Sequence, residues 1–433
     1  MSNDSRSARR ATRAATIARH GRLRRATLIP GLLMYVGVIV AVLAVSVASV
    51  AGIAVWQTVA QIKPGIHLSH IRGTNEPAPQ VGSISGPVNL LLTGSDTRTG
   101  QNGFQDAADL RGSSGTGNND VTMVMHISAD HQHATVVSIP RDLLVNIPSC
   151  PRANGGTAGP VTNAMFNTTL SRGGLGCTVI SAEKLTGLDI PYAAEISFDG
   201  VIDMSDVVGG VDVCLATPLK DKYVGLNLAA GNVTIQGDQA LAFLRSRHGV
   251  GDGSDLGRIS DQQLFMSSLM RKLTSSGVLG NPFTLYQLAN AAVKNMELSD
   301  TLSSPTTMVS IALALKNISL ANVVFVEWPT KSNPAFPGRV VAEQPADRIL
   351  ATALDNDQPV LLSGKLGRAT VNGTTPATPV VTATATPTGK ATAKSTATPT
   401  PTPTGPAAAP VALPGDVTGQ TAAQNTCAKG YRP

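Results

Sequence analysis

Residues Val88–Arg98 read VNLLLTGSDTR, an apolar run that ends in a polar turn. A continuous apolar run of this length is typical of a strand that is buried on both faces of a sheet. The turn carries Asp96 and Arg98, and loops at the carboxyl ends of strands in α/β sheets converge on ligand sites. The stretch therefore predicts a central strand that delivers charged side chains to a functional loop.

Further strands and helices are predicted downstream of this run. Val121–Ile127 (VTMVMHI) and Ala134–Ile139 (ATVVSI) flank a polar turn and are expected to form a hairpin, and short strands are expected at Val211–Leu215 and Val323–Glu327. Helices are predicted at Asn163–Leu170, Cys177–Thr186, Phe198–Val208, Gln262–Ser275, Pro282–Met296, Pro305–Lys316 and Ala346–Leu354. This mixture indicates a layered α/β domain over residues 88–358.

The two ends of the chain differ from this domain. Residues 1–27 form a basic tail, and no charged residue occurs from Ala26 to Ile62. Residues 28–56 are predicted to be one transmembrane helix. The arginines before it place the N-terminus in the cytoplasm, so the chain is expected to be a single-pass type II cell-membrane protein with an extracytoplasmic catalytic domain. A stalk is expected at 57–87, and residues 359–433 are predicted to be a Thr/Pro/Ala-rich low-complexity tail.

Composition narrows the function classes. The net charge is +6, but most of the excess lies in the basic tail, so bulk nucleic-acid binding is not indicated. Aromatic residues make up only 3%, which argues against stacking platforms for single-stranded nucleic acid. Neither a GxSxG elbow nor a Walker A sequence is present, so nothing supports a serine hydrolase or a P-loop nucleotidase. The histidines are interpreted as solvated or structural.

The four cysteines indicate an oxidising compartment. Cys150, Cys177, Cys214 and Cys427 are even in number and include no CxxC motif, which favours disulfides over zinc. Cys150 and Cys177 bracket a glycine-rich loop and are paired first. Cys214 and Cys427 then remain, and whether they pair is left open.

Four polar patches could carry chemistry: Gly94–Arg98, Asn118–Thr122, Ser138–Asp142 and the long stretch Ala240–Gln263. In the last, Arg245 and Arg247 share a face if the backbone is extended and diverge if it is helical. Arg258 and Gln262 lie one helical turn apart. Converging arginines suit bidentate recognition of phosphate groups.

The carboxylates among these patches allow two interpretations. Asp96, Asp120 and Asp142 could form salt bridges with the arginines and only hold the loops together. Alternatively, Asp96 and Asp120 bind one Mg²⁺ ion, which in proteins takes one or two carboxylates plus substrate phosphate oxygens.

Five segments resemble, in the same order, the LytR-CpsA-Psr family: VNLLLTGSDTR, NNDVTMVMHI, VVSIPRDLLVNIP, LTGLDIPYAAEISFDGVIDMSDVVGGVDVCL and ALAFLRSRH followed by DLGRISDQQ. The resemblance covers roughly residues 88–273, and the cysteine loop and Thr/Pro tail look like actinobacterial members. It implies an α/β/α sandwich with a central mixed sheet, preceded by the transmembrane helix, and a long apolar groove for a prenyl tail.

The resemblance also implies roles for single residues. Asp96 and Asp120 match acids that bind Mg²⁺ (or Mn²⁺). The catalytic set is then these two acids with Arg141, Arg245 and Arg247, and the substrate contacts are Arg98, Arg258, Gln262 and Asp142. Two departures stand out. Asp261 replaces an arginine that many members carry, which weakens the positive field, and the segment 99–119 between the two acids is long.

The function that the resemblance implies is an extracytoplasmic phosphotransferase. It would move a glycopolymer from a polyprenyl-pyrophosphate carrier onto peptidoglycan. The alternatives are a non-catalytic binder of polyprenyl phosphates or anionic polymers, a pyrophosphatase that releases the polymer to water, and a transcription attenuator. The acid pair favours an enzyme over a binder, since binding alone has no need of Asp96 and Asp120, and an outside location disfavours direct DNA contact. Transfer and hydrolysis differ only in the acceptor.

Overall fold

The computed structural model describes residues 34–42, 45–46, 49, 65–70, 86–101, 117–152, 155–275, 287–288, 291–292, 294–373 and 409–431. The chain divides into two units, Met1–Gln57 and Thr58–Pro433. In the first unit, residues 34–42, 45–46 and 49 are helical. Within the described ranges, no helix combines the length and apolarity that crossing a membrane requires. The rest of the segment predicted at 28–56, and the basic tail 1–27, lie outside the described residues.

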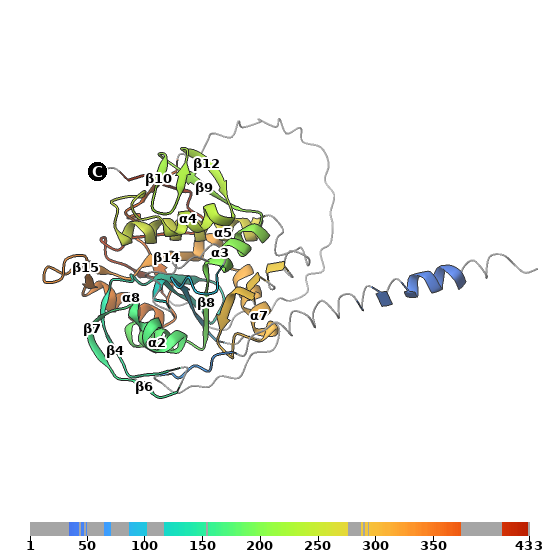
Figure 1. Ribbon diagram of the computed structural model, residues 1–433, viewed down its shortest axis with the longest axis horizontal. Coiled ribbons are helices and arrows are strands. Elements are labelled where there is room, and N and C mark those ends of the chain that lie inside the picture. The colour runs from blue at the N-terminus through green and yellow to red at the C-terminus, as the bar shows by residue number, and fades with distance from the viewer. Residues whose placement is uncertain are drawn as a thin grey trace, which may run out of the picture. The chain divides into compact units, whose positions relative to one another are not determined.

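A seven-stranded mixed sheet forms the centre of the second unit (Figure 1). Its order is β13 (Met296–Leu298), β8 (Tyr192–Ile196), β1 (Val88–Ser95), β2 (Asn119–Ile127), β3 (Ala134–Ser138), β14 (Val323–Glu327) and β20 (Gly419–Thr421). β1 runs parallel to β8, and β3 runs parallel to β14, whereas the other neighbours are antiparallel. The four predicted central strands are confirmed, and β2 and β3 form the expected hairpin.

Helices cover both faces of this sheet. On one face, α2 (Thr168–Thr186) and α8 (Ala346–Asp355) pack against strand residues that include Leu91 and Val137. On the other face, α5 (Asp255–Ser275) and α7 (Pro305–Lys316) pack against residues that include Val136. Successive strand residues point to opposite faces, so neighbours such as Val136 and Val137 serve different layers. The expected α/β/α layering around a mixed sheet is therefore present.

The remaining elements form smaller sheets and helices around this core. They are β4 (Leu144–Ile147), β5 (Cys150–Pro151), β6 (Thr157–Ala158), β7 (Val161–Met165), α3 (Phe198–Val207), β9 (Val211–Leu215), β10 (Leu219–Asp221), β11 (Leu226–Leu228), β12 (Gly231–Ile235), α4 (Gly237–Arg245), η2 (Leu320–Asn322), β15 (Thr330–Ser332), β16 (Val340–Ala342), β17 (Val360–Leu361), β18 (Thr370–Asn372), β19 (Val411–Ala412) and β21 (Thr426–Ala428).

Two helix predictions need correction. The segment Asn163–Leu170 was expected to be helical, but its first part belongs to β7, which pairs with β4, and α2 begins only at Thr168. Pairing with β4 overrides the local helical preference. The helix predicted from Gln262 begins one turn or more earlier, at Asp255. Of the helix predicted at 282–296, residues 287–288, 291–292 and 294–296 are described, and all are helical except Met296, which begins β13.

The predicted domain boundaries also need correction. β20, from the expected tail, pairs with β14 in the central sheet, and β21 joins a second sheet of order β12-β9-β21-β18. Part of the expected stalk joins the domain as well, because Ile66 bridges to Ser299 and Leu68 is 3% exposed. The folded unit therefore extends beyond residues 88–358 at both ends. The Thr/Pro repeat, 374–408, lies outside the described residues.

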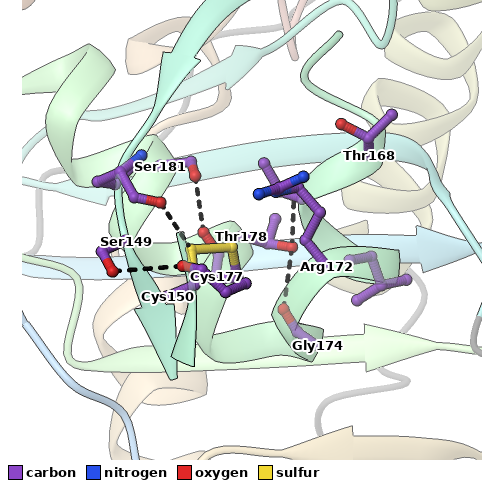
Figure 2. Close-up of a disulfide and its surroundings, with 12 residues drawn as sticks. Ser149, Cys150, Thr168, Arg172, Gly174, Cys177, Thr178 and Ser181 are labelled. Carbon is purple, nitrogen blue, oxygen red and sulfur yellow. Dashed lines mark hydrogen bonds between the residues drawn. A yellow bond between two sulfur atoms is a disulfide. The ribbon is translucent and has the colours of Figure 1, made fainter. Parts of the chain in front are cut away.

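The predicted Cys150–Cys177 disulfide is confirmed, and Cys214 and Cys427, whose pairing was left open, form the second disulfide. Cys150–Cys177 joins β5 to α2 (Figure 2). Cys214–Cys427 joins β9 to β21, where the two cysteines are register partners. Because the second bridge spans 213 residues of sequence, loop entropy gives it a stabilising effect on the order of 5 kcal/mol. It fastens the C-terminal segment to the second sheet.

Candidate functional site

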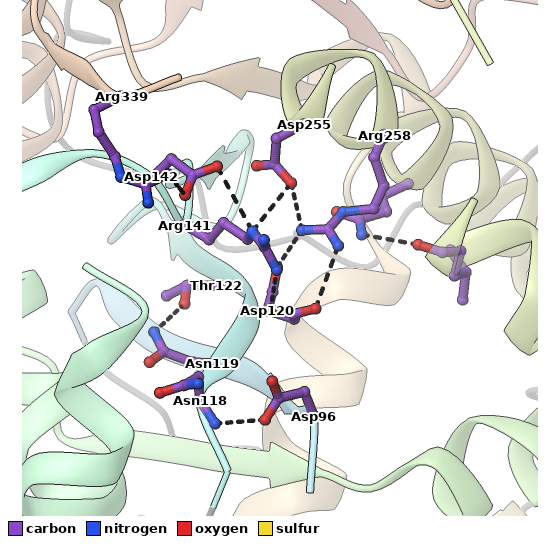
Figure 3. Close-up of polar contacts among 12 residues, drawn as sticks. Asp96, Asn118, Asn119, Asp120, Thr122, Arg141, Asp142, Asp255, Arg258 and Arg339 are labelled. Carbon is purple, nitrogen blue, oxygen red and sulfur yellow. Dashed lines mark hydrogen bonds and ion pairs between the residues drawn. The ribbon is translucent and has the colours of Figure 1, made fainter. Parts of the chain in front are cut away.

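The charged residues predicted from the sequence gather at one edge of the central sheet (Figure 3). Asp96 follows the carboxyl end of β1, and Arg141 lies shortly after the carboxyl end of β3. Asp120 is at the start of β2, which runs antiparallel to both strands and so begins at the same edge. The strand directions therefore bring the first three polar patches together.

Asp120 is the centre of an ion-pair network. Its Oδ1 lies 2.5 Å from Arg141 Nη1, and its Oδ2 lies 3.4 Å from Arg258 Nη1. Arg258 Nη2 also donates a hydrogen bond to the Asp120 carbonyl oxygen, at 2.8 Å. Both arginines meet again at Asp255, whose Oδ1 is 2.6 Å from Arg258 Nη2 and 3.6 Å from Arg141 Nε. Two acids thus hold two guanidiniums in fixed positions.

Asp96 lies beside this network in a tight backbone arrangement. The Asn118 backbone N–H donates to Asp96 Oδ1 at 2.6 Å, and the Asp96 N–H donates to the Asn118 carbonyl at 3.0 Å. Gly117 has φ +81°, and a Cβ there would meet Ser95 Oγ at 2.4 Å, so only glycine fits. Burial, and then the nearby Asp120 carboxylate, raise the pKa of Asp96 above its usual value. The two predicted metal ligands are therefore electrostatic neighbours.

Arg245 is the last residue of α4, so the helical alternative for the Ala240–Leu244 run is the correct one. Its guanidinium carbon lies 4.3 Å from the centroid of the Phe198 ring. Burial and the positive charges of Arg98 and Arg258 lower the pKa of Arg245, although Asp120 and Asp96 act in the opposite direction. An anion bound among these guanidiniums would relieve their repulsion.

Arg247 lies two residues after Arg245, beyond the end of α4. The chain is extended at Ser246, and the Arg247 N–H donates to Asp221 Oδ2 at 3.1 Å. Among the described residues, no ion pair connects the Arg247 side chain to Asp96, Asp120 or Asp255. Its predicted catalytic role gains no support from this geometry.

The glycine-rich loop between α4 and α5 is held by hydrogen bonds to Asp221 of β10 and by a serine of its own. Asp221 Oδ2 accepts from Ser246 Oγ and from the Gly249 N–H, at 2.9 and 3.2 Å. Ser254 caps α5 by accepting from the Gly257 N–H at 3.2 Å. Arg258 consequently projects from the first turn of a helix and is only 4% exposed, rather than following a flexible loop.

Two further predicted substrate contacts are engaged with protein groups. Gln262 is buried and donates through Nε2 to the Leu244 carbonyl at 3.1 Å, which ties α5 to α4 just before Arg245. Asp142 lies 2.9 Å from Arg339 and 3.7 Å from Arg141. Both residues are placed to position the arginines.

Sequence reasoning missed Asp255, which bridges Arg141 and Arg258. The signal was available, because an acid in the first turn of a helix three residues before an arginine is a favourable pair. The ring of Phe198 beneath Arg245 was also missed, and nothing in the sequence spacing of the two residues indicates that contact.

Asp261 is the most unusual buried acid of α5. It is 0% exposed, and within the described part of the chain neither carboxylate oxygen has a hydrogen-bond partner. Burial raises the pKa of Asp261 well above its usual value. The residue that replaces the family's arginine therefore favours a neutral carboxyl inside the helix packing.

Asp261→Asn should stabilise the protein at pH 7, because burial raises the pKa of Asp261. When folding raises the pKa of an acid, the free energy of unfolding falls as the pH rises from the pKa of the acid in the unfolded state towards its pKa in the folded state. Asparagine does not titrate and therefore removes that loss. Urea unfolding at pH 4 and pH 7 measures it, and the gain should shrink at pH 4. Asp212→Asn, at an exposed position of β9, is the matched control. An Asp261→Asn protein less stable than wild type at both pH values would contradict the assignment.

A separate group of side chains, at the opposite ends of the central strands, could hold a metal ion. His70, Glu183 and Asp189 each offer one ligand atom, and these atoms lie within 4.8 Å of one another. His70 Nδ1 is 2.7 Å from Glu183 Oε1 and 3.5 Å from Asp189 Oδ1. Asp189 precedes β8, whereas Asp96 follows the parallel strand β1, so this group is remote from the arginine cluster.

Comparisons with known proteins agree with the fold and the motif order. The model of the LytR_cpsA_psr family matches residues 57–352. The "Cell wall biosynthesis protein LcpA" of Corynebacterium glutamicum is 31% identical over 270 residues, which is 58% of this chain and 51% of that protein. The "Polyisoprenyl-teichoic acid--peptidoglycan teichoic acid transferase TagU" of Bacillus cereus is 32% identical over 190 residues, covering 44% and 54%.

A solved structure shares the fold. Protein gbs0355 from Streptococcus agalactiae superposes with a TM-score of 0.50 at 20% identity, covering 63% of this chain and 88% of that one. The chain spans about half the length of the curated relatives that it matches. Because the family match covers more than half of the chain, this protein belongs to the LytR-CpsA-Psr family.

Proposed function

We propose that this protein is an extracytoplasmic phosphotransferase that moves a glycopolymer from a polyprenyl-pyrophosphate carrier onto peptidoglycan. The observation that carries the proposal is the gathering of Arg98, Arg245 and Arg258 beside Asp96 and Asp120. Family membership supports it, and the name of one relative describes transfer of teichoic acid from a polyisoprenyl carrier to peptidoglycan.

The arginine side of the cluster suits the pyrophosphate of the donor. The lowered pKa of Arg245 reflects burial and the neighbouring cations, and an anion there would be attracted by all of them. Arg245 is held against Phe198, and Arg258 is held by Asp120 and Asp255. Guanidiniums fixed in this way can bind phosphate oxygens in pairs with little loss of side-chain entropy.

Asp96 and Asp120 fit a hard divalent cation, Mg²⁺ or Mn²⁺. The fit rests on the Asp96 carboxylate, whose raised pKa reflects burial beside a second acid and whose hydrogen bonds within the described residues come from Asn118 alone. Carboxylate oxygens from two residues, completed by substrate phosphate, are the usual ligands of such ions. When bound, the ion would neutralise charge on the pyrophosphate and polarise the phosphoryl group.

The protein's own residues then arrange the displacement. A hydroxyl oxygen of the acceptor forms a new bond to the phosphorus that carries the glycopolymer, and the bond to the bridging oxygen breaks. The acceptor loses its proton, and polyprenyl phosphate leaves with the negative charge. Arg245 and Arg258 lie where that charge develops, so they stabilise the transition state more than the bound donor.

The same donor site could serve hydrolysis if water replaced the acceptor, or binding alone. The acid pair favours catalysis, because two carboxylates weaken rather than strengthen the binding of a pyrophosphate unless a cation joins them. The two disulfides support an extracytoplasmic location, with residues 28–56 as the proposed single membrane anchor.

Metal removal tests this proposal. Detergent-solubilised full-length protein is incubated with a lipid-pyrophosphate glycan and soluble peptidoglycan fragments. Chelation should lower the transfer rate by at least about 100-fold, or roughly 3 kcal/mol of barrier, and Mg²⁺ or Mn²⁺ should restore it. Donor binding, followed separately by calorimetry, reports whether the protein remains folded. Transfer at the full rate in chelator would refute the role of the ion.

A further inference from the structure

A cavity of about 650 Å³ lies next to the arginine–aspartate cluster and has no part in the donor site. Its walls are the chain after β14 (Trp328–Thr330), the segment Lys365–Thr370 and the C-terminal residues Asp416–Thr418 and Lys429. All residues of the last two walls lie beyond residue 352, where the family match ends. A volume of this size is typical of a site for a small organic ligand.

Two segments connect the cavity wall to the cluster. The loop that precedes α5 contributes Asp252 to the cavity wall, and Asp255, the first residue of α5, forms the ion pairs with Arg141 and Arg258. Glu327, another wall residue, is the register partner of Ser138, three residues before Arg141. The charges of Asp255 and Asp252 act on Glu327, which places it within electrostatic reach of both.

Ion pairs connect the arginines of the cluster to the start of α5. Arg98 and Arg258 act electrostatically on Arg245, and Arg258 pairs with both Asp120 and Asp255. In a phosphoryl transfer the attacking and leaving oxygens are roughly in line with the phosphorus. With the pyrophosphate among the arginines, the acceptor needs a site of its own beside the cluster, and the cavity offers one.

The lining of the cavity suits a hydroxyl-rich ligand of low net charge. Its acids and bases nearly balance: Asp252, Glu327, Glu343 and Asp416 against Lys365, Arg368 and Lys429. Several threonines add neutral hydroxyl groups. A saccharide with hydroxyl, amide and peptide groups can bond to both signs, whereas four acids against three bases give a pyrophosphate no net attraction.

Glu327 is the wall residue best placed to contact such a hydroxyl. It is 7% exposed, and within the described residues the only side chain that donates to its carboxylate is Thr418, to Oε2 at 3.1 Å. Burial raises the pKa of Glu327 to about 7. Thr418 belongs to the C-terminal segment, which β20 and the Cys214–Cys427 bridge hold in place.

We propose that this cavity is the acceptor subsite, which binds a peptidoglycan saccharide and uses the C-terminal segment as one wall. The proposal rests on the proposed function, because that function defines the acceptor. In this proposal the C-terminal segment not only stabilises the fold but also helps to determine which acceptor binds.

The test measures acceptor binding without turnover. A synthetic disaccharide-pentapeptide of peptidoglycan is titrated into the full-length protein by calorimetry. Thr330→Trp, which puts a large ring at the cavity wall, should weaken binding at least about tenfold. Ser332→Trp places the same ring two residues away in β15, at an exposed position outside the wall, and should leave the affinity unchanged.

A second pair of variants tests the proposal if the Thr330→Trp protein fails to fold. Lys365→Glu adds a fifth acid to the wall and should weaken binding of the fragment severalfold, whereas Lys316→Glu, at an exposed position of α7, should not. Equal affinities within both pairs would overturn the proposal. So would a loss of affinity for the lipid-pyrophosphate donor in place of the fragment. Fragment binding that depends on the cavity, in a protein that never transfers, would instead reject the proposed function.

Discussion

Replacing Asp120 by asparagine should lower the rate of glycopolymer transfer by at least about 100-fold while the domain stays folded, a barrier increase of roughly 3 kcal/mol. Asp120 holds Arg141 through Oδ1 and Arg258 through Oδ2, so the neutral amide weakens both ion pairs at once. It also removes one of the two carboxylates proposed to hold the divalent cation. Steady-state transfer with a lipid-pyrophosphate donor measures the loss.

The matched control is Asp212→Asn, the same change at an exposed site of β9. It should retain wild-type turnover. The unfolding midpoint of Asp120→Asn should stay close to that of wild type, because the Asp120 side chain is partly exposed and Asp255 still pairs with both arginines. An Asp120→Asn protein that transfers at the wild-type rate would remove Asp120 from the chemistry.

Arg141→Lys and Arg245→Lys should each reduce turnover by at least about tenfold, or roughly 1.4 kcal/mol, while donor binding falls much less. Lysine keeps the charge but loses the planar fork that lets Arg141 reach Asp120, Asp142 and Asp255 together. At Arg245 it also loses the flat contact with Phe198. Turnover and donor affinity are measured on the same preparations.

Arg348→Lys, on the exposed side of α8, is the control for this pair and should change neither quantity. The comparison separates an enzyme from a binding protein. If binding and turnover fell in strict proportion, the arginines would only grip the lipid. A normal turnover in both variants would contradict the transition-state role assigned to them.

The central layers of the fold could be predicted because their signals are local. The apolar runs at Val88, Val121 and Ala134 become β1, β2 and β3, since a strand buried on both faces needs apolar residues throughout. The polar patches that follow them meet because strand directions put their ends at one edge. The Cys150–Cys177 bridge followed from the glycine-rich loop between its cysteines.

Other features depend on contacts that sequence spacing does not encode. The strands β20 and β21 are three residues each, too short to stand out from a Thr/Pro-rich tail, and they form because the central sheet and β9 offer free edges. Arg247 lies outside α4, which ends at Arg245, and its backbone N–H donates to Asp221 of β10. Gln262 acts on Leu244 because the crossing of two helices buries it.

The most direct test of the account is the mass of the product made by the full-length protein from a lipid-pyrophosphate glycan and soluble peptidoglycan fragments. Transfer predicts a fragment that has gained the glycan and one phosphate in a phosphodiester, with an equal amount of polyprenyl phosphate released. Glycan phosphate appearing only in free form, with no fragment adduct at any acceptor concentration, would contradict transfer and identify a pyrophosphatase.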